Sequence, residues 1–193
     1  MAKKNEPLRI TLLCEDRMQE QFFAAICEEE GWQVLDRRVA PKGVRSAEQW
    51  VREQLPTWVL QYRKWRRENR ALMVGIDGDK VGVPGRRDSL NARLRGQGQA
   101  AMDPGEAIAL MVPTWSIETW ILYLHHGELV PESEQSKDFL PARLRAQEHG
   151  TLTRQAMRNV QSAWSRREVH PDLPSLEAGW AECRRLQLLR APA

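Results

Sequence analysis

The stretch ALMVGIDGDKVGVPGRR, Ala71 to Arg87, decides how this chain folds. It opens with the apolar run Ala71–Ile76, which ends abruptly in Asp77 and Asp79 with a single glycine between them. A short apolar run bounded by turn residues is typical of a strand buried on both faces of a parallel sheet. The acids that follow are compatible with a solvated turn or with a cation site at the edge of a sheet.

Working outward, apolar runs alternate with segments of helical periodicity. This alternation predicts an α/β fold, namely a Rossmann-like, four-stranded, mostly parallel sheet flanked by helices. Ser46 is the expected N-cap of the second helix, and Pro56 is expected to break or kink it. The expected strands are Leu8–Cys14, Trp32–Pro41, Ala71–Ile76 and Ala107–Val112; the expected helices are Glu15–Gly31, Ser46–Asn69, Ser89–Gly96 and Ser116–Gly127.

Beyond residue 127 no further strand is indicated. Two helices, Arg154–Glu168 and Pro174–Leu189, are expected in this part of the chain. We therefore predict an α/β domain over residues 1–127. Residues 128–193 are predicted to form a C-terminal helical extension packed on the same core.

Composition describes an ordinary globular protein of 193 residues, with 41% hydrophobic and 28% charged residues and a net charge of +3. The three cysteines form no C-x-x-C pair, which argues against a disulfide framework or a zinc ribbon and predicts a reduced, cytoplasmic location. The apolar segment Ala107–Leu124 is interrupted by Pro113 and carries Glu118, so no membrane span is expected.

Carboxylates follow several of the predicted strands. Glu15 and Asp16 follow the first strand, Asp77 and Asp79 follow the third, and Glu118 lies in the helix after the fourth. In an open parallel sheet the carboxyl ends of the strands share one edge, where ligands bind. Oxygen ligands of this kind suit Mg²⁺, and Gly78 gives the backbone freedom to turn both aspartates towards one ion.

These residues carry a resemblance to the Toprim family. The segments LLCEDRMQEQFF, MVGIDGD and VPTWSIETWILYL resemble small stand-alone bacterial Toprim-like proteins, related to overcoming-lysogenization-defect nucleases and in some cases linked to phage defence. The resemblance covers roughly residues 8–127. Many Toprim proteins have glycine near the first glutamate, where this chain reads Cys14-Glu15-Asp16. Two roles therefore stay open for Asp16: it shares the role of Glu15, or it caps the following helix.

The resemblance implies roles for four acids. Glu15 matches a glutamate that serves in acid–base chemistry and can contact metal. Asp77 and Asp79 match the D-x-D metal ligands, and together with Glu15 they form the expected catalytic set. Glu118 matches a late glutamate that is an additional metal ligand in the nuclease-like branch. The implied cofactor is Mg²⁺ or Mn²⁺.

Basic residues supply candidate contacts to nucleic acid, with solvated surface as the alternative for each. Trp50, Trp58 and Trp65 share one helix face, which favours core packing over base stacking. The candidate contacts are Lys80, Arg86 and Arg87 after the D-x-D motif, and Arg63, Lys64, Arg66 and Arg67 at the end of the second helix.

Three functions remain open at this point. The first is a metal-dependent nuclease or phosphoryl-transfer enzyme, acting on DNA in preference to RNA, with a role in phage defence. The second is a non-catalytic or conditionally active subunit of a separate ATPase, since the chain carries no phosphate-loop motif of its own. The third is an α/β binding protein whose acids are ordinary turns.

Overall fold

The computed structural model describes residues 6–66, 68–133, 152–168 and 170–190. Its centre is a sheet in which every neighbouring pair of strands is parallel, in the order β2-β1-β3-β4. The predicted α/β Rossmann-like class is confirmed, and the sheet is wholly rather than mostly parallel. The strands are β1 (Arg9–Cys14), β2 (Gln33–Val39), β3 (Arg70–Gly75) and β4 (Ile108–Met111).

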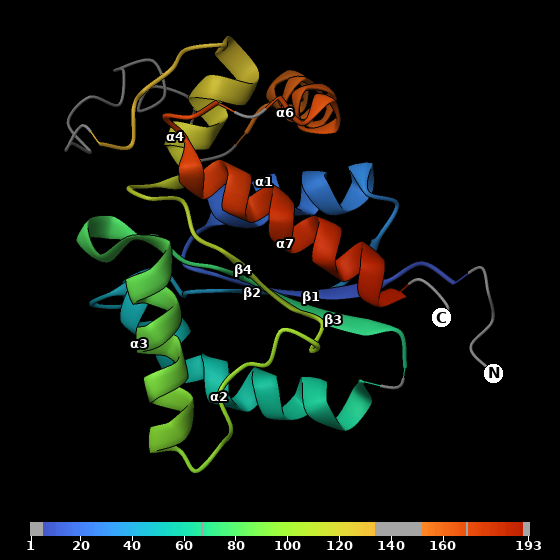
Figure 1. Ribbon diagram of the computed structural model, residues 1–193, viewed down its shortest axis with the longest axis vertical. Coiled ribbons are helices and arrows are strands. Elements are labelled where there is room, and N and C mark those ends of the chain that lie inside the picture. The colour runs from blue at the N-terminus through green and yellow to red at the C-terminus, as the bar shows by residue number, and fades with distance from the viewer. Residues whose placement is uncertain (1–5, 67, 134–151, 169, 191–193) are drawn as a thin grey trace.

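Helices cover both faces of this sheet (Figure 1). One face carries α2 (Ala47–Trp65) and α3 (Gly82–Gly96). The other carries α1 (Arg17–Glu29), α4 (Ile117–Ile121), α6 (Arg154–Arg166) and α7 (Pro174–Arg190). A short 3₁₀ turn, η1 (Asp79–Val81), precedes α3, and a π-helical turn, η2 (Leu122–His126), extends α4.

Each face of the sheet has its own apolar core. Side chains alternate along a strand, so Leu12 of β1 packs towards α1 while its neighbour Leu13 packs towards α2. The C-terminal helices α6 and α7 belong to the core on the α1 side of the sheet. Trp164 of α6 lies 6.2 Å from Phe22 of α1 and 5.4 Å from Trp180 of α7, between ring centroids.

The structure corrects the expected break at Pro56 and the expected start of the third helix, while a kink at Pro56 stays a prediction. Helix α2 runs without a break through Pro56, because Leu55 and Val59 on either side are buried against the sheet. That packing offsets the roughly 3 kcal/mol that an internal proline costs. Helix α3 begins at Gly82 rather than Ser89. Pro84 falls in its first turn, where no backbone N–H donor is needed.

In the described ranges, no helix has the length and apolar character needed to cross a membrane.

Candidate functional site

The sheet has a topological switch point between β1 and β3. The chain passes from β1 to its neighbour β2 on one side, then crosses by α2 to β3 on the other side of β1. In doubly wound sheets the crevice outside the carboxyl ends of two such strands is where ligands bind. Glu15 follows β1 and Asp77 closely follows β3, so both acids lie at the carboxyl ends of these two strands.

One direct hydrogen bond joins the Asp77 backbone to the Glu15 side chain, and Gln19 bonds to both residues. The Asp77 backbone N–H donates to Glu15 Oε1 at 2.8 Å. Gln19, a fully buried residue of α1, bridges them from below: its Nε2 donates to Asp77 Oδ1 at 2.8 Å, and its Oε1 accepts from the Glu15 N–H at 3.1 Å. Sequence reasoning missed Gln19. The available signal was a polar residue on the same helical face as the apolar Phe23 and Ile26.

Asp16 caps the helix that follows it, which is one of the two roles left open by the sequence. Its Oδ1 accepts from the Gln19 backbone N–H at 2.8 Å, which makes it the N-cap of α1. The cap fixes the first turn of α1 and therefore the position of Gln19 beneath the two acids.

The turn that carries Asp77 and Asp79 is closely packed. The Gly78 N–H donates to the Pro113 carbonyl at 2.7 Å, so the loop after β4 lies directly against the turn. Asp79 has a φ of 46°, in the left-handed region that aspartate tolerates better than most residues. Backbone in this region is often found at functional sites.

Arg86 brings a cation to the same place. Its side chain is 7% exposed, and its Nη2 lies 3.3 Å from Asp79 Oδ2. Its Nη1 donates to Glu48 at the start of α2. Because two carboxylates engage this guanidinium, Arg86 orients Asp79 in the structure as it stands.

Burial raises the pKa of Glu15 from 4.5 to about 7. The Asp77 N–H and the nearby Arg86 cation lower this pKa, while the negative charges of Asp79 and Asp16 raise it. Glu15 therefore exchanges a proton close to neutral pH. A carboxyl group with this property is a candidate for acid–base chemistry.

The acids fit a magnesium site of the sparse kind. Mg²⁺ is commonly held by one or two carboxylates, with water and substrate phosphate completing its shell. Glu15 and Asp77 supply two carboxylates to the carboxyl ends of β1 and β3, and the Asp79 charge acts on Glu15. Their role as ligands of one ion stays a prediction. In the described ranges no group of three or more histidine, cysteine, aspartate or glutamate side chains is arranged to hold a metal ion.

Glu118 is not brought into such a group. It lies in the first turn of α4 with a half-buried side chain. Its role as a further metal ligand stays a prediction.

The predicted basic residues divide between two ends of the sheet. Lys80, in η1, and Arg86 lie beside the acids, while Arg87 pairs with Glu182 of α7 at 2.5 Å. The C-terminal end of α2 leads into the start of β3, which places Arg63, Lys64 and Arg66 at the opposite, amino edge. Arg67 lies outside the described residues.

Arg63 has structural partners at that amino edge. Its guanidinium makes two hydrogen bonds to Glu106, at 2.6 and 2.9 Å, and donates to the Ala100 and Ala101 carbonyls. The contact of these basic residues with nucleic acid stays a prediction.

A buried carboxylate, Glu132, lies behind the loop that follows β4. It is 8% exposed and accepts from the Thr114 hydroxyl and from the Ser175 N–H and hydroxyl. Ser175 stands in the first turn of α7, so Glu132 ties that helix to the β4 loop. The sequence around Glu132 is polar and gave no signal of burial.

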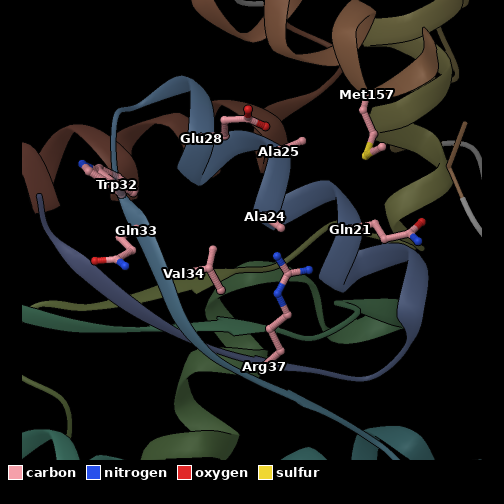
Figure 2. A pocket seen from close by; sticks show the side chains of 9 residues that line it. All are labelled: Gln21, Ala24, Ala25, Glu28, Trp32, Gln33, Val34, Arg37 and Met157. Atoms are coloured by element: carbon pink, nitrogen blue, oxygen red, sulfur yellow. The ribbon is translucent and has the colours of Figure 1, made fainter. Parts of the chain in front are cut away.

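A separate hollow of about 580 Å³ opens between α1, the edge strand β2 and α6 (Figure 2). Trp32, Arg37 and Met157 are among its lining residues. None of the three switch-point acids lines it, and the Arg37 guanidinium is paired with the buried Glu20.

The fold and the acids at the carboxyl ends of β1 and β3 define a class. The chain is a Rossmann-like α/β protein with two hydrogen-bonded acidic residues at its switch point. Comparison with protein-family models, with curated proteins and with solved structures gives no match for this chain. The resemblance to the Toprim family therefore rests on the residues of the sequence itself.

Proposed function

We propose that this chain is a Toprim-like nuclease that uses Mg²⁺ or Mn²⁺ to hydrolyse phosphodiester bonds in nucleic acid. The observation that supports it most is the hydrogen bond from the Asp77 backbone N–H to the Glu15 carboxylate at the switch point, beside Asp79 and Arg86. The order of these acids in the sequence matches the first-strand glutamate and the D-x-D motif of that family.

Each residue has a chemical role in this proposal. Asp77 and Asp79 provide oxygen ligands, and Gln19 holds the Asp77 carboxylate in place. Glu15 accepts the proton of a water whose oxygen attacks the phosphorus, while the bond to the leaving oxygen breaks and that oxygen takes a proton from solvent. The bound ion supplies charge stabilisation at the phosphate and lowers the pKa of the water.

Cleavage assays test the proposal. Plasmid, linear duplex, single-stranded DNA and RNA are incubated with Mg²⁺ and then with Mn²⁺, with DNA as the expected substrate. Asp77→Asn keeps the oxygen that accepts from Gln19, and Glu15→Gln keeps the oxygen that accepts from the Asp77 N–H. Each variant should fold normally and lose on the order of 10²-fold or more in rate.

Asp88→Asn is the matched control, since Asp88 is an exposed acid on α3 away from these contacts. It should cut at the wild-type rate. Undiminished cleavage by Asp77→Asn would overturn the proposal.

The sequence favours a second candidate, a subunit that is active only with a separate ATPase. Its 193 residues contain no phosphate-loop motif, so they do not supply a motor. In that case the purified chain binds Mn²⁺ and cuts nothing, and it gains activity when the ATPase is added. A role in phage defence and a cytoplasmic location belong to either candidate.

A further inference from the structure

The loop after β2, residues 40–45, lies beside the acids although it is distant from them in sequence. The Ala40 N–H donates to the carbonyl of Cys14, the residue before Glu15, at 3.2 Å. The loop therefore leaves the sheet at the same edge as Glu15, one strand to the side. This position follows from the parallel pairing of β1 with β2.

Two cations of this loop have no partner among the described residues. Lys42 and Arg45 are exposed, and neither makes a hydrogen bond or an ion pair with a described residue. The arginines that precede them on β2 differ, since Arg37 pairs with Glu20 and Arg38 with Asp36. The loop thus presents two charges that a polyanion can neutralise.

A third exposed cation stands in the turn after β3. Lys80 follows Asp79 directly, and its side chain likewise has no such partner in the described part of the chain. The strand order β2-β1-β3 places Glu15, at the end of β1, between the β2 loop and the turn that carries Asp77 and Lys80. Strands β2 and β3 are two strand spacings, about 10 Å, apart.

We infer that a nucleic-acid strand crosses the carboxyl edge of the sheet, with its phosphates on Lys42 and Arg45 at one flank and on Lys80 at the other. A phosphodiester between these two groups of cations then lies over Glu15, with Asp77 next to it. The acids repel phosphate, so a cation on each side is what holds a polyanion across them. This inference rests on the proposed function and identifies the surface that carries its substrate.

The amino edge offers a matched comparison. Arg95 and Arg184 are also exposed, and their side chains also make no hydrogen bond or ion pair with a described residue. Arg95 is in the last turn of α3, and Arg184 precedes Arg185, which donates to the Ile108 carbonyl at the start of β4, so both lie at the opposite end of the sheet from Glu15. Replacing either pair by glutamine removes two positive charges, so only the position differs.

Binding is measured by fluorescence anisotropy with labelled duplex and single-stranded oligonucleotides in Mg²⁺. The Asp77→Asn background prevents cleavage, and the salt concentration is varied. Lys42→Gln/Arg45→Gln should reduce the slope of log affinity against log salt by about 1.8 for duplex DNA. With affinity unchanged at 1 M salt, that is about a 60-fold loss at 0.1 M. Lys80→Gln should reduce the slope by about half as much, and Arg95→Gln/Arg184→Gln should leave it unchanged.

The outcomes separate this inference from the proposed function. If Lys42→Gln/Arg45→Gln binds with the wild-type slope while Asp77 is still needed for cleavage, the inference fails and the nuclease proposal stands. If Lys42 and Arg45 set the slope but no cleavage depends on Asp77, the surface stands and the nuclease proposal fails. Absence of binding to duplex DNA, single-stranded DNA and RNA overturns the inference.

Discussion

Glu15 combines a buried position with a short polar network, and this combination has a consequence for stability. Its pKa in the folded chain is about 7, against 4.5 when unfolded, because burial penalises its charged form. A carboxyl group of this kind binds its proton more tightly in the folded state. It therefore contributes most to stability below pH 4.5, and that contribution is lost as the pH rises to about 7.

We expect the wild-type protein to lose about 2–3 kcal/mol relative to Glu15→Gln between pH 5 and pH 8, in the absence of divalent ions. Glutamine stays neutral while keeping the oxygen that accepts from the Asp77 N–H. Urea unfolding of both proteins at both pH values measures the difference. Parallel profiles would show that Glu15 titrates at its ordinary value.

Gly78 is needed for space rather than for an unusual φ, which is −74°. A Cβ at this position would lie 3.0 Å from the Thr114 carbonyl oxygen and 3.1 Å from that of Pro113. These are backbone atoms, which cannot rotate away. We expect Gly78→Ala to lower the free energy of unfolding by about 1–3 kcal/mol and to displace the flanking aspartates.

Chemical denaturation compares Gly78→Ala with Gly96→Ala, whose added Cβ meets nothing within 4 Å. The control should match the wild type or exceed it slightly. Equal stability of the two variants would mean that the loop after β4 yields easily.

At the residue scale, sequence reasoning predicted which acids follow the strands, because strand ends are local and parallel topology brings them to one edge. It could not predict Gln19 or Glu132. Their roles depend on partners far along the chain: Gln19 donates to Asp77, and Glu132 accepts from Ser175. Such pairings follow from packing between elements, which has no periodic signal in the sequence.

At the scale of elements, Glu132 is the link between α7 and the loop after β4. Its carboxylate sits at the N-terminal end of α7, where backbone N–H groups and the helix dipole favour negative charge. The Trp120 indole donates to the same Ser175 hydroxyl at 2.9 Å, which extends the link to α4.

We expect Glu132→Ala to cost about 2–4 kcal/mol, because it leaves the donors of Ser175 and Thr114 unsatisfied. Glu132→Gln should cost less. The amide oxygen can still accept from the Ser175 N–H and hydroxyl, and the Thr114 hydroxyl can turn to accept from the amide NH₂ group. Urea denaturation of the three proteins gives the order. A Gln variant as unstable as the Ala variant would show that the negative charge itself is required.

Element boundaries were predicted least well where tertiary packing overrides local preference. The buried residues Leu55 and Val59 hold α2 together across Pro56, and no local feature of that segment reveals it. The α3 boundary differs in kind. Pro84 and two glycines look like loop residues in sequence, yet a first helical turn accepts them.

At the scale of the whole molecule, the two edges of the sheet have different character. Both ends carry exposed cations with no ion pair to a described residue, but only at the carboxyl end do they lie near the acids of the switch point. At the amino end the acid Glu106 is paired with Arg63. The sequence predicted that basic residues contact nucleic acid, but it did not show at which end of the sheet each of them lies. Only the strand order shows that Lys42 belongs beside Glu15 and that Lys64 does not.

The packing of α7 on α4 predicts how the whole chain unfolds. A Cβ at Gly179 of α7 would lie 2.7 Å from the ring of Trp120, which is fully buried in the core shared with α1 and β1. Although alanine favours helix by about 1 kcal/mol, we expect Gly179→Ala to destabilise the protein by about 1–3 kcal/mol through this overlap. Because the core is continuous, the loss should shift one cooperative transition, with far-ultraviolet circular dichroism and tryptophan fluorescence coinciding.

Gly96→Ala, with open space around its Cβ, is the matched helical control. Two separate transitions, with only one moved by Gly179→Ala, would instead show that residues 128–193 fold as an independent unit.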